Sequence, residues 1–98
     1  MRPTDCMTNE QLLADARTDL HALRQDGRWA AYSAARPGRV VGVETLLSTI
    51  HDLEFNHGQR GSPAPRSVAV NVWRLSQRHS ASLDEFAAAR RLGSHSRA

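Results

Sequence analysis

The segment 66–79, RSVAVNVWRLSQRH, decides the fold class of this chain, because it fits two secondary structures. Val68, Val70 and Val72 alternate along the chain, and this period of two is typical of a β-strand. Val68, Val72 and Leu75 also recur at i, i+4 and i+7, the spacing of one face of an α-helix. The helical pattern runs through the whole segment and the strand pattern through only part of it, so length favours a helix.

Towards the C-terminus, Ser82 and Glu85 have the spacing of a capping box, in which a hydroxyl and a carboxylate each accept a hydrogen bond from the other residue's backbone N–H. This pattern predicts a separate helix over 82–92, closed at Leu92-Gly93. Between 66–79 and 82–92 the sequence therefore predicts a short break.

The N-terminal half contains further helical patterns. Thr8 and Gln11 form a capping box that predicts a helix over 9–25, ended by Asp26-Gly27. Its apolar positions share one helical face and are Leu12, Leu13, Ala16, Leu20 and Leu23. The alanine-rich stretch 28–35 predicts a short second helix, with a turn at Pro37-Gly38.

A third helix is predicted over 43–56, where valine, leucine and isoleucine recur with helical spacing and Asn56-His57-Gly58 ends the pattern. Residues 57–65 contain two glycines and two prolines without apolar periodicity, so they are expected to form a mobile loop. The stretches 1–7 and 94–98 are expected to be frayed tails.

With 98 residues, the chain is expected to form one domain. The predicted fold is all-α, a small bundle of four to five short helices. The alternative is an α+β fold with short strands near 39–43 and 67–73. The large aromatic residues Trp29, Tyr32 and Trp73 are expected to fill the core of such a small, alanine-rich bundle.

Every one of the 13 basic residues is arginine. A GC-rich genome would explain this choice, and the physical consequence is a surface of planar donors suited to carboxylates and phosphates. Residues 1–56 carry six arginines against eight acids, whereas 57–98 carry seven against two. This asymmetry indicates either an anionic partner for the C-terminal half or charge complementarity between the two halves.

No catalytic, metal-binding or cofactor motif emerges from the sequence. The nine serines lack the settings that activate a hydroxyl nucleophile, and the glycines lack the context of a phosphate loop. The five histidines lack the i, i+3 or i, i+4 spacing of helical metal ligands. Asp15 and Asp19 are expected on the exposed polar face of their helix. The chain is therefore expected to be no enzyme and to hold no metal or cofactor.

The strongest functional pattern is the polar face of the helix over 66–79. Ser67, Asn71, Arg74 and Arg78 form one stripe opposite Val68, Val72 and Leu75. Arginine suits phosphates and guanine edges, and asparagine suits adenine edges. The predicted partner-binding or nucleic-acid-binding residues are Arg66, Asn71, Arg74, Arg78, Arg90 and Arg91. A second basic stripe, at Arg17, His21, Arg24 and Arg28, is expected to be cancelled by the aspartates interleaved with it.

Two functions remain open. The first is a small helical protein that engages a larger protein or nucleoprotein partner through its basic C-terminal half, as an adaptor, an antitoxin or a phage-type inhibitor. The second is a DNA- or RNA-binding regulatory module. A net charge of +3 is modest for a dedicated nucleic-acid binder, which favours the first. A lone cysteine, Cys6, indicates a reducing compartment such as the cytoplasm. No membrane span is expected, and the small core per helix predicts a homo-oligomer.

Overall fold

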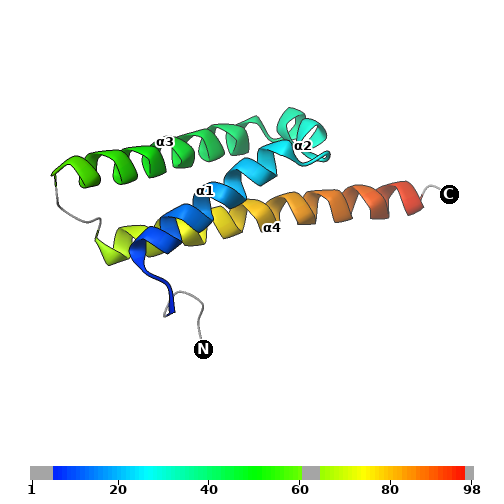
Figure 1. Ribbon diagram of the computed structural model, residues 1–98. Coiled ribbons are helices and arrows are strands. Elements are labelled where there is room, and N and C mark those ends of the chain that lie inside the picture. The colour runs from blue at the N-terminus through cyan, green and yellow to red at the C-terminus, as the bar shows by residue number, and fades with distance from the viewer. Residues whose placement is uncertain (1–5, 61–64, 97–98) are drawn as a thin grey trace.

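Four α-helices make up nearly all of the chain that the structure, a computed structural model, describes, which is residues 6–60 and 65–96. They are α1 (Asn9–Gln25), α2 (Trp29–Ala35), α3 (Pro37–Arg60) and α4 (Arg66–Ser96) (Figure 1). The predicted all-α bundle is confirmed. Within the described residues there is no strand, so the alternative with strands near 39–43 and 67–73 is wrong.

Helix α1 begins and ends where the sequence predicts. The Oγ1 atom of Thr8 accepts a hydrogen bond from the backbone N–H of Gln11 at 3.1 Å. In return, Oε1 of Gln11 accepts from the backbone N–H of Thr8 at 2.8 Å. The capping box therefore satisfies two donors that the first turn of a helix leaves without intrahelical partners. At the other end the backbone turns extended at Asp26.

Helix α3 is longer than predicted at both ends. It begins at Pro37, because a proline at the first helical position has the required φ and needs no N–H partner there. The break from α2 falls on Arg36, whose φ of −132° and ψ of 64° lie outside the helical region. At the other end α3 continues through Gly58 to Arg60, so the predicted loop at 57–65 is wrong for 57–60. Residues 61–64 lie outside the described residues.

Helix α4 is continuous where the sequence predicts a break between 66–79 and 82–92. Ser82 is an interior helical residue, so the predicted capping box with Glu85 is wrong. The intervening residues include neither proline nor glycine, and the serine hydroxyl finds its partner on another helix instead. The tails predicted at 1–7 and 94–98 lie partly outside the described residues, at 1–5 and 97–98, and α4 itself continues to Ser96.

Contacts between helices show how the bundle is arranged. Residues of α1 meet residues of α4 in the same order along both helices, at Asn9 with Arg66 and at Asp15 with Trp73, so these two helices run parallel. Helix α3 runs antiparallel to α1, since Arg17 pairs with Glu54 whereas Arg24 pairs with Glu44. In Figure 1, α3 and α4 are two long arms with α1 between them, and the molecule is elongated, at 58 × 30 × 17 Å.

The core is one apolar cluster along these contacts. Its buried side chains are Leu12, Leu13, Ala16, Leu20, Leu23, Tyr32, Val43, Leu46, Ile50, Ala69, Val72 and Leu83. All five apolar positions predicted for the first helix are among them. The prediction that Tyr32 fills the core is confirmed, while Trp29 and Trp73 are partly buried against it. Among the described helices, none is both long and apolar enough to cross a membrane.

Candidate functional site

The exposed side of α4 presents the polar stripe that the sequence predicts. Ser67, Asn71, Arg74 and Arg78 are all exposed, and they lie on the opposite side of the helix from the buried Val72. Neither Arg74 nor Arg78 forms an ion pair or hydrogen bond with a described residue. Both guanidinium groups therefore remain available to an external acceptor.

Leu75 belongs to this exposed surface, although its spacing from Val68 and Val72 predicts a core position. Its exposed fraction is 41%. Ser76 is fully buried in its place, and its hydroxyl donates to the carbonyl oxygen of Trp73 at 2.7 Å. Because that hydrogen bond satisfies the hydroxyl, burial of the serine costs little. We define the α4 face as Asn71, Arg74, Leu75 and Arg78.

Arg66 lies apart from the α4 face and is engaged within the chain. Its Nη1 atom donates to the Oδ1 atom of Asn9 at 3.1 Å and to the carbonyl oxygen of Met7. Both acceptors are at the start of α1. Arg66 therefore holds the beginning of α4 against the beginning of α1.

Arg90 and Arg91 also lie apart from the α4 face. Both are exposed, but at roughly 3.6 residues per turn they point to other sides of α4 than Arg78. The structure thus brings together three of the six predicted binding residues, Asn71, Arg74 and Arg78, on one surface.

The aspartates of α1 hold α4 in place instead of lying free on an exposed face. The Nε1–H group of Trp73 donates to Oδ2 of Asp15 at 2.7 Å, and Nε2 of Gln77 donates to Oδ2 of Asp19 at 2.7 Å. Both contacts are partly buried. The expectation that Asp15 and Asp19 are exposed polar-face residues is therefore wrong, because the sequence pattern of one helix does not show which polar groups of another will meet it.

The basic stripe of α1 is neutralised mainly from α3. Arg17 donates to both carboxylate oxygens of Glu54, and Nε of Arg24 lies 3.2 Å from Oε1 of Glu44. The aspartates interleaved on α1 were expected to cancel this stripe, but Asp15 and Asp19 are bonded to α4. Of the interleaved aspartates only Asp26 pairs with the stripe, at Arg28, and Glu54 and Glu44 of α3 pair with Arg17 and Arg24.

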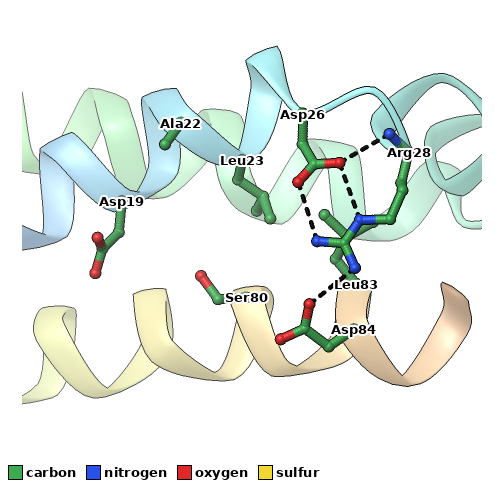
Figure 2. A pocket seen from close by; sticks show the side chains of 8 residues that line it. All are labelled: Asp19, Ala22, Leu23, Asp26, Arg28, Ser80, Leu83 and Asp84. Carbon is green, nitrogen blue, oxygen red and sulfur yellow. Dashed lines mark hydrogen bonds and ion pairs between the residues drawn. The ribbon is translucent and has the colours of Figure 1, made fainter. Parts of the chain in front are cut away.

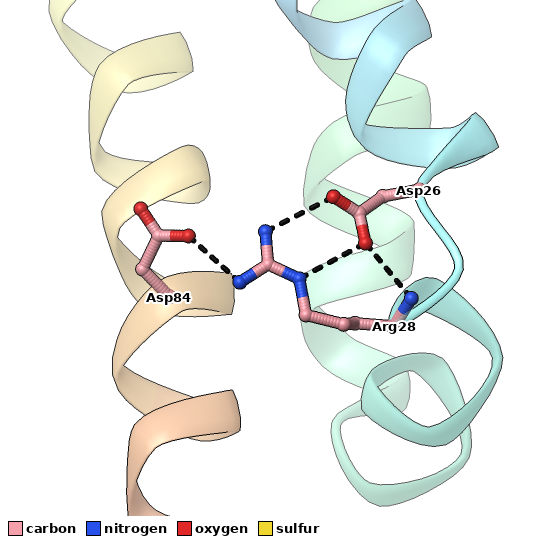
Figure 3. A network of polar contacts seen from close by, with 3 residues as sticks. All are labelled: Asp26, Arg28 and Asp84. Atoms are coloured by element: carbon pink, nitrogen blue, oxygen red, sulfur yellow. Dashed lines mark hydrogen bonds and ion pairs between the residues drawn. The ribbon is translucent and has the colours of Figure 1, made fainter.

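Arg28 joins the end of α1 to α4 (Figure 3). Its Nε and Nη2 atoms each lie 3.0 Å from an oxygen of Asp26, and its backbone N–H donates to the same carboxylate at 2.8 Å. Its Nη1 atom lies 3.0 Å from Oδ1 of Asp84 on α4. These hydrogen bonds from Arg28 lower the pKa of Asp26 to about 2 and raise the pKa of the guanidinium.

A pocket of about 180 Å³ lies beside this ion-pair network, between α1 and α4 (Figure 2). Its lining residues are Asp19, Ala22, Leu23, Asp26, Arg28, Ser80, Leu83 and Asp84. Each of its three carboxylates already accepts hydrogen bonds or an ion pair from the chain itself, from Gln77 or from Arg28. The carboxylates of this pocket therefore serve to join the two helices.

Sequence reasoning missed a cluster at the junction of α2, α3 and α4. The guanidinium carbons of Arg36 and Arg90 each lie 5.6 Å from the ring centroid of Phe86. Phe86 and Arg90 are four residues apart, so helix geometry brings them together, whereas the approach of Arg36 depends on the packing of the helices.

His79 of α4 packs against α3. Its ring lies where a side chain on Gly42 of α3 would be, with Cε1 3.1 Å from the position of a Cβ atom at that glycine. Its Nδ1 atom is buried without a hydrogen-bond partner. Burial, and then the positive charge of Arg39, lower its pKa. In the part of the chain that the structure describes, no group of three or more His, Cys, Asp or Glu side chains could hold a metal ion.

Comparison with known proteins identifies no relative. No protein-family description matches the sequence, and neither the curated proteins nor the solved structures gave a significant match.

Proposed function

We propose that this chain is a small non-enzymatic binding protein that docks an acidic surface of a larger protein or nucleoprotein through the α4 face. The observation that carries the proposal is the exposed leucine between two unpaired arginines. Leu75 is 41% exposed, and Arg74 and Arg78 have no described acidic partner.

The combination of an apolar side chain with arginines favours a protein partner. Protein interfaces pair an apolar anchor in a pocket with arginines at their centre, whereas contacts with a phosphate backbone need positive charge alone. Binding would remove the exposed Leu75 from water and give Arg74 and Arg78 carboxylate acceptors. The rest of the charge distribution agrees, because Arg17, Arg24 and Arg28 are already neutralised within the fold.

A second candidate, recognition of DNA or RNA, is favoured by the position of Asn71. It shares the exposed side of α4 with Arg74 and Arg78, and a helix presenting these three side chains could contact base edges and phosphates in a major groove. Leu75 would then meet either a thymine methyl group or solvent.

The proposal extends to the location and assembly of the protein. A single cysteine agrees with a cytoplasmic setting. Two further large apolar side chains, Val41 and Phe55, are 65% and 54% exposed on α3, which favours self-association. Size-exclusion chromatography with light scattering, at several concentrations, would measure the oligomeric state.

The function is tested by photo-crosslinking from position 71 in cells, with a photoreactive amino acid in place of Asn71. A partner protein should be captured by the otherwise wild-type chain. It should be lost when Arg74→Glu and Arg78→Glu are combined, and reduced by Leu75→Ala. Arg91→Glu is the matched control, because Arg91 is exposed on another side of α4.

A parallel titration with duplex DNA and RNA separates the two candidates. Under the protein-binding proposal, duplex binding is weak and Leu75→Ala leaves it unchanged. Under the nucleic-acid alternative, wild-type affinity falls roughly tenfold or more between about 50 and 200 mM salt. Crosslinked products that are insensitive to both the charge reversals and Leu75→Ala would contradict the proposed face.

A further inference from the structure

We propose that Arg36 and Arg90, whose guanidinium carbons each lie 5.6 Å from the ring centroid of Phe86, form a binding site for a phosphate dianion, either free phosphate or the phosphate of a monoester. The site is separate from the α4 face. It joins the residue between α2 and α3 to the C-terminal part of α4.

The first argument is that the fold gathers two like charges without compensating them. Both guanidinium carbons lie 5.6 Å from the same ring centroid. Apart from a long hydrogen bond of 3.4 Å from Arg36 to the carbonyl oxygen of Ala35, neither arginine has a described polar partner. Cation–π contacts at exposed sites are weak, so an added anion would relieve the remaining repulsion between the two guanidinium groups.

The acids of α4 do not neutralise this pair. Asp84 is bonded to Arg28, and Glu85 is exposed and pairs with neither Arg36 nor Arg90. The arginines of α1, by contrast, each have a carboxylate. Arg36 and Arg90 therefore keep their positive charge next to Phe86, without an acidic partner among the described residues.

The second argument is that the aromatic ring that both arginines contact is firmly placed. Phe86 packs edge-on against Tyr32, with ring centroids 5.4 Å apart and an interplanar angle of 75°. Tyr32 is fully buried, and its hydroxyl lies 2.8 Å from Oγ of Ser82. A fixed ring restricts both guanidinium groups before any ligand arrives, which lowers the entropy lost on binding.

The third argument is the chemistry of the anion. A phosphate dianion matches this environment better than a carboxylate does, because it supplies two negative charges and several oxygens for the planar donors of arginine.

The experiment is a titration of the whole chain with inorganic phosphate at constant ionic strength, followed by the Nε–Hε resonances of its arginines in NMR spectra. Arg36 and Arg90 should shift together along one saturable curve. Arg36→Gln and Arg90→Gln should each weaken binding by roughly tenfold or more, because each removes one charge-assisted contact. Arg91→Gln, at an exposed arginine that belongs to neither the proposed site nor the α4 face, is the matched control and should bind as the wild type does.

A second pair of ligands distinguishes the sources of the phosphate. Phenyl phosphate, a monoester, should bind at least as well as inorganic phosphate, and diphenyl phosphate, with a single charge, should bind more weakly. Preference for the monoester over inorganic phosphate would assign the site to a phosphorylated partner, and equal affinity would assign it to free phosphate.

Two results would overturn the proposal. One is a linear, unsaturable shift of all exposed arginines, including Arg78, which would mean diffuse ion association. The other is saturable binding that survives both Arg36→Gln and Arg90→Gln. Since these side chains are exposed, neither variant threatens the core, and circular dichroism would verify the fold. None of these outcomes depends on the function proposed for the α4 face.

Discussion

The hydroxyl group of Tyr32 lies 2.8 Å from the hydroxyl group of Ser82, in a contact that joins α2 to the interior of α4. Tyr32 is fully buried, and Ser82 is partly buried. The serine that the sequence marks as the start of a new helix is therefore a tertiary partner within a continuous one. This contact positions the ring of Tyr32, against which Phe86 packs edge-on.

Tyr32→Phe should lower the free energy of unfolding by about 0.5–1.5 kcal/mol, because it removes one partner of a partly buried hydrogen bond and leaves the ring in place. Urea denaturation would measure it. Combining it with Ser82→Ala in a double-mutant cycle should give a total loss smaller than the sum of the two single losses. Ser48→Ala, on the exposed side of α3, is the control; additive losses would mean that the two hydroxyls do not interact.

Ala81→Pro tests whether α4 is continuous. Ala81 is exposed, so the substitution removes no core contact, but proline inside a helix costs about 3 kcal/mol. Ala81→Gly should cost only about 1 kcal/mol. Denaturation of both variants, with circular dichroism as the probe, would measure the difference. If proline were tolerated as well as glycine, α4 would instead be two helices with a junction before Ser82.

Asp15→Ala should destabilise the protein by about 1–3 kcal/mol, because it leaves the indole N–H of the partly buried Trp73 without its acceptor. Asp15→Asn should cost less, since the amide oxygen can still accept. Denaturation followed by tryptophan fluorescence would measure the free energy of unfolding of both variants. Asp52→Ala, on an exposed part of α3, should have little effect.

The stability of the bundle should fall on acidification below about the ordinary histidine pKa of 6.5. Burial, together with Arg39, lowers the pKa of His79 in the folded chain, so the unfolded chain takes up the proton first. The contribution of His79 to stability is therefore fully present above the pKa of this histidine in the unfolded chain. It declines as the pH falls below that value, and it levels off once the pH is below the pKa of His79 in the folded chain.

His79→Gln should flatten this decline between neutral pH and the range where carboxylates begin to titrate. Thermal denaturation across that pH range would measure the slope for both proteins. His21→Gln is the control, because His21 is exposed on α1. A slope that is unchanged in the His79 variant would assign the pH dependence to another group.

Two glycines of α3 should respond differently to alanine. A Cβ atom at Gly38 has open space around it, so Gly38→Ala should stabilise the protein by about 0.5–1 kcal/mol through the helix propensity of alanine. A Cβ atom at Gly42 would lie 3.1 Å from Cε1 of His79. Part or all of the gain from Gly42→Ala should therefore be lost as the histidine ring moves. Equal stabilisation of both variants in urea would show that His79 moves aside without cost.

Several features of this protein follow from the sequence alone because their energetics are local. The capping box of Thr8 and Gln11 fixes the start of α1 within three residues of chain. Helical periodicity predicts that Asn71, Arg74 and Arg78 share one side of a helix, and they do. The same periodicity selects an all-α fold, because it extends over more of the ambiguous segment than the alternation of valines does.

Only the tertiary structure decided which helices are continuous and which polar groups meet. Ser82 fits a helix start as well as a helix interior, and its contact with Tyr32, 50 residues away, accompanies the interior position. The acceptor of Trp73 lies 58 residues away on α1, and Arg36 lies against the ring of Phe86 on α4. Such pairings depend on how whole helices pack. Helix geometry fixes the position of a neighbouring side chain three or four residues away, whereas the position of a side chain on another helix depends on the orientation of both helices.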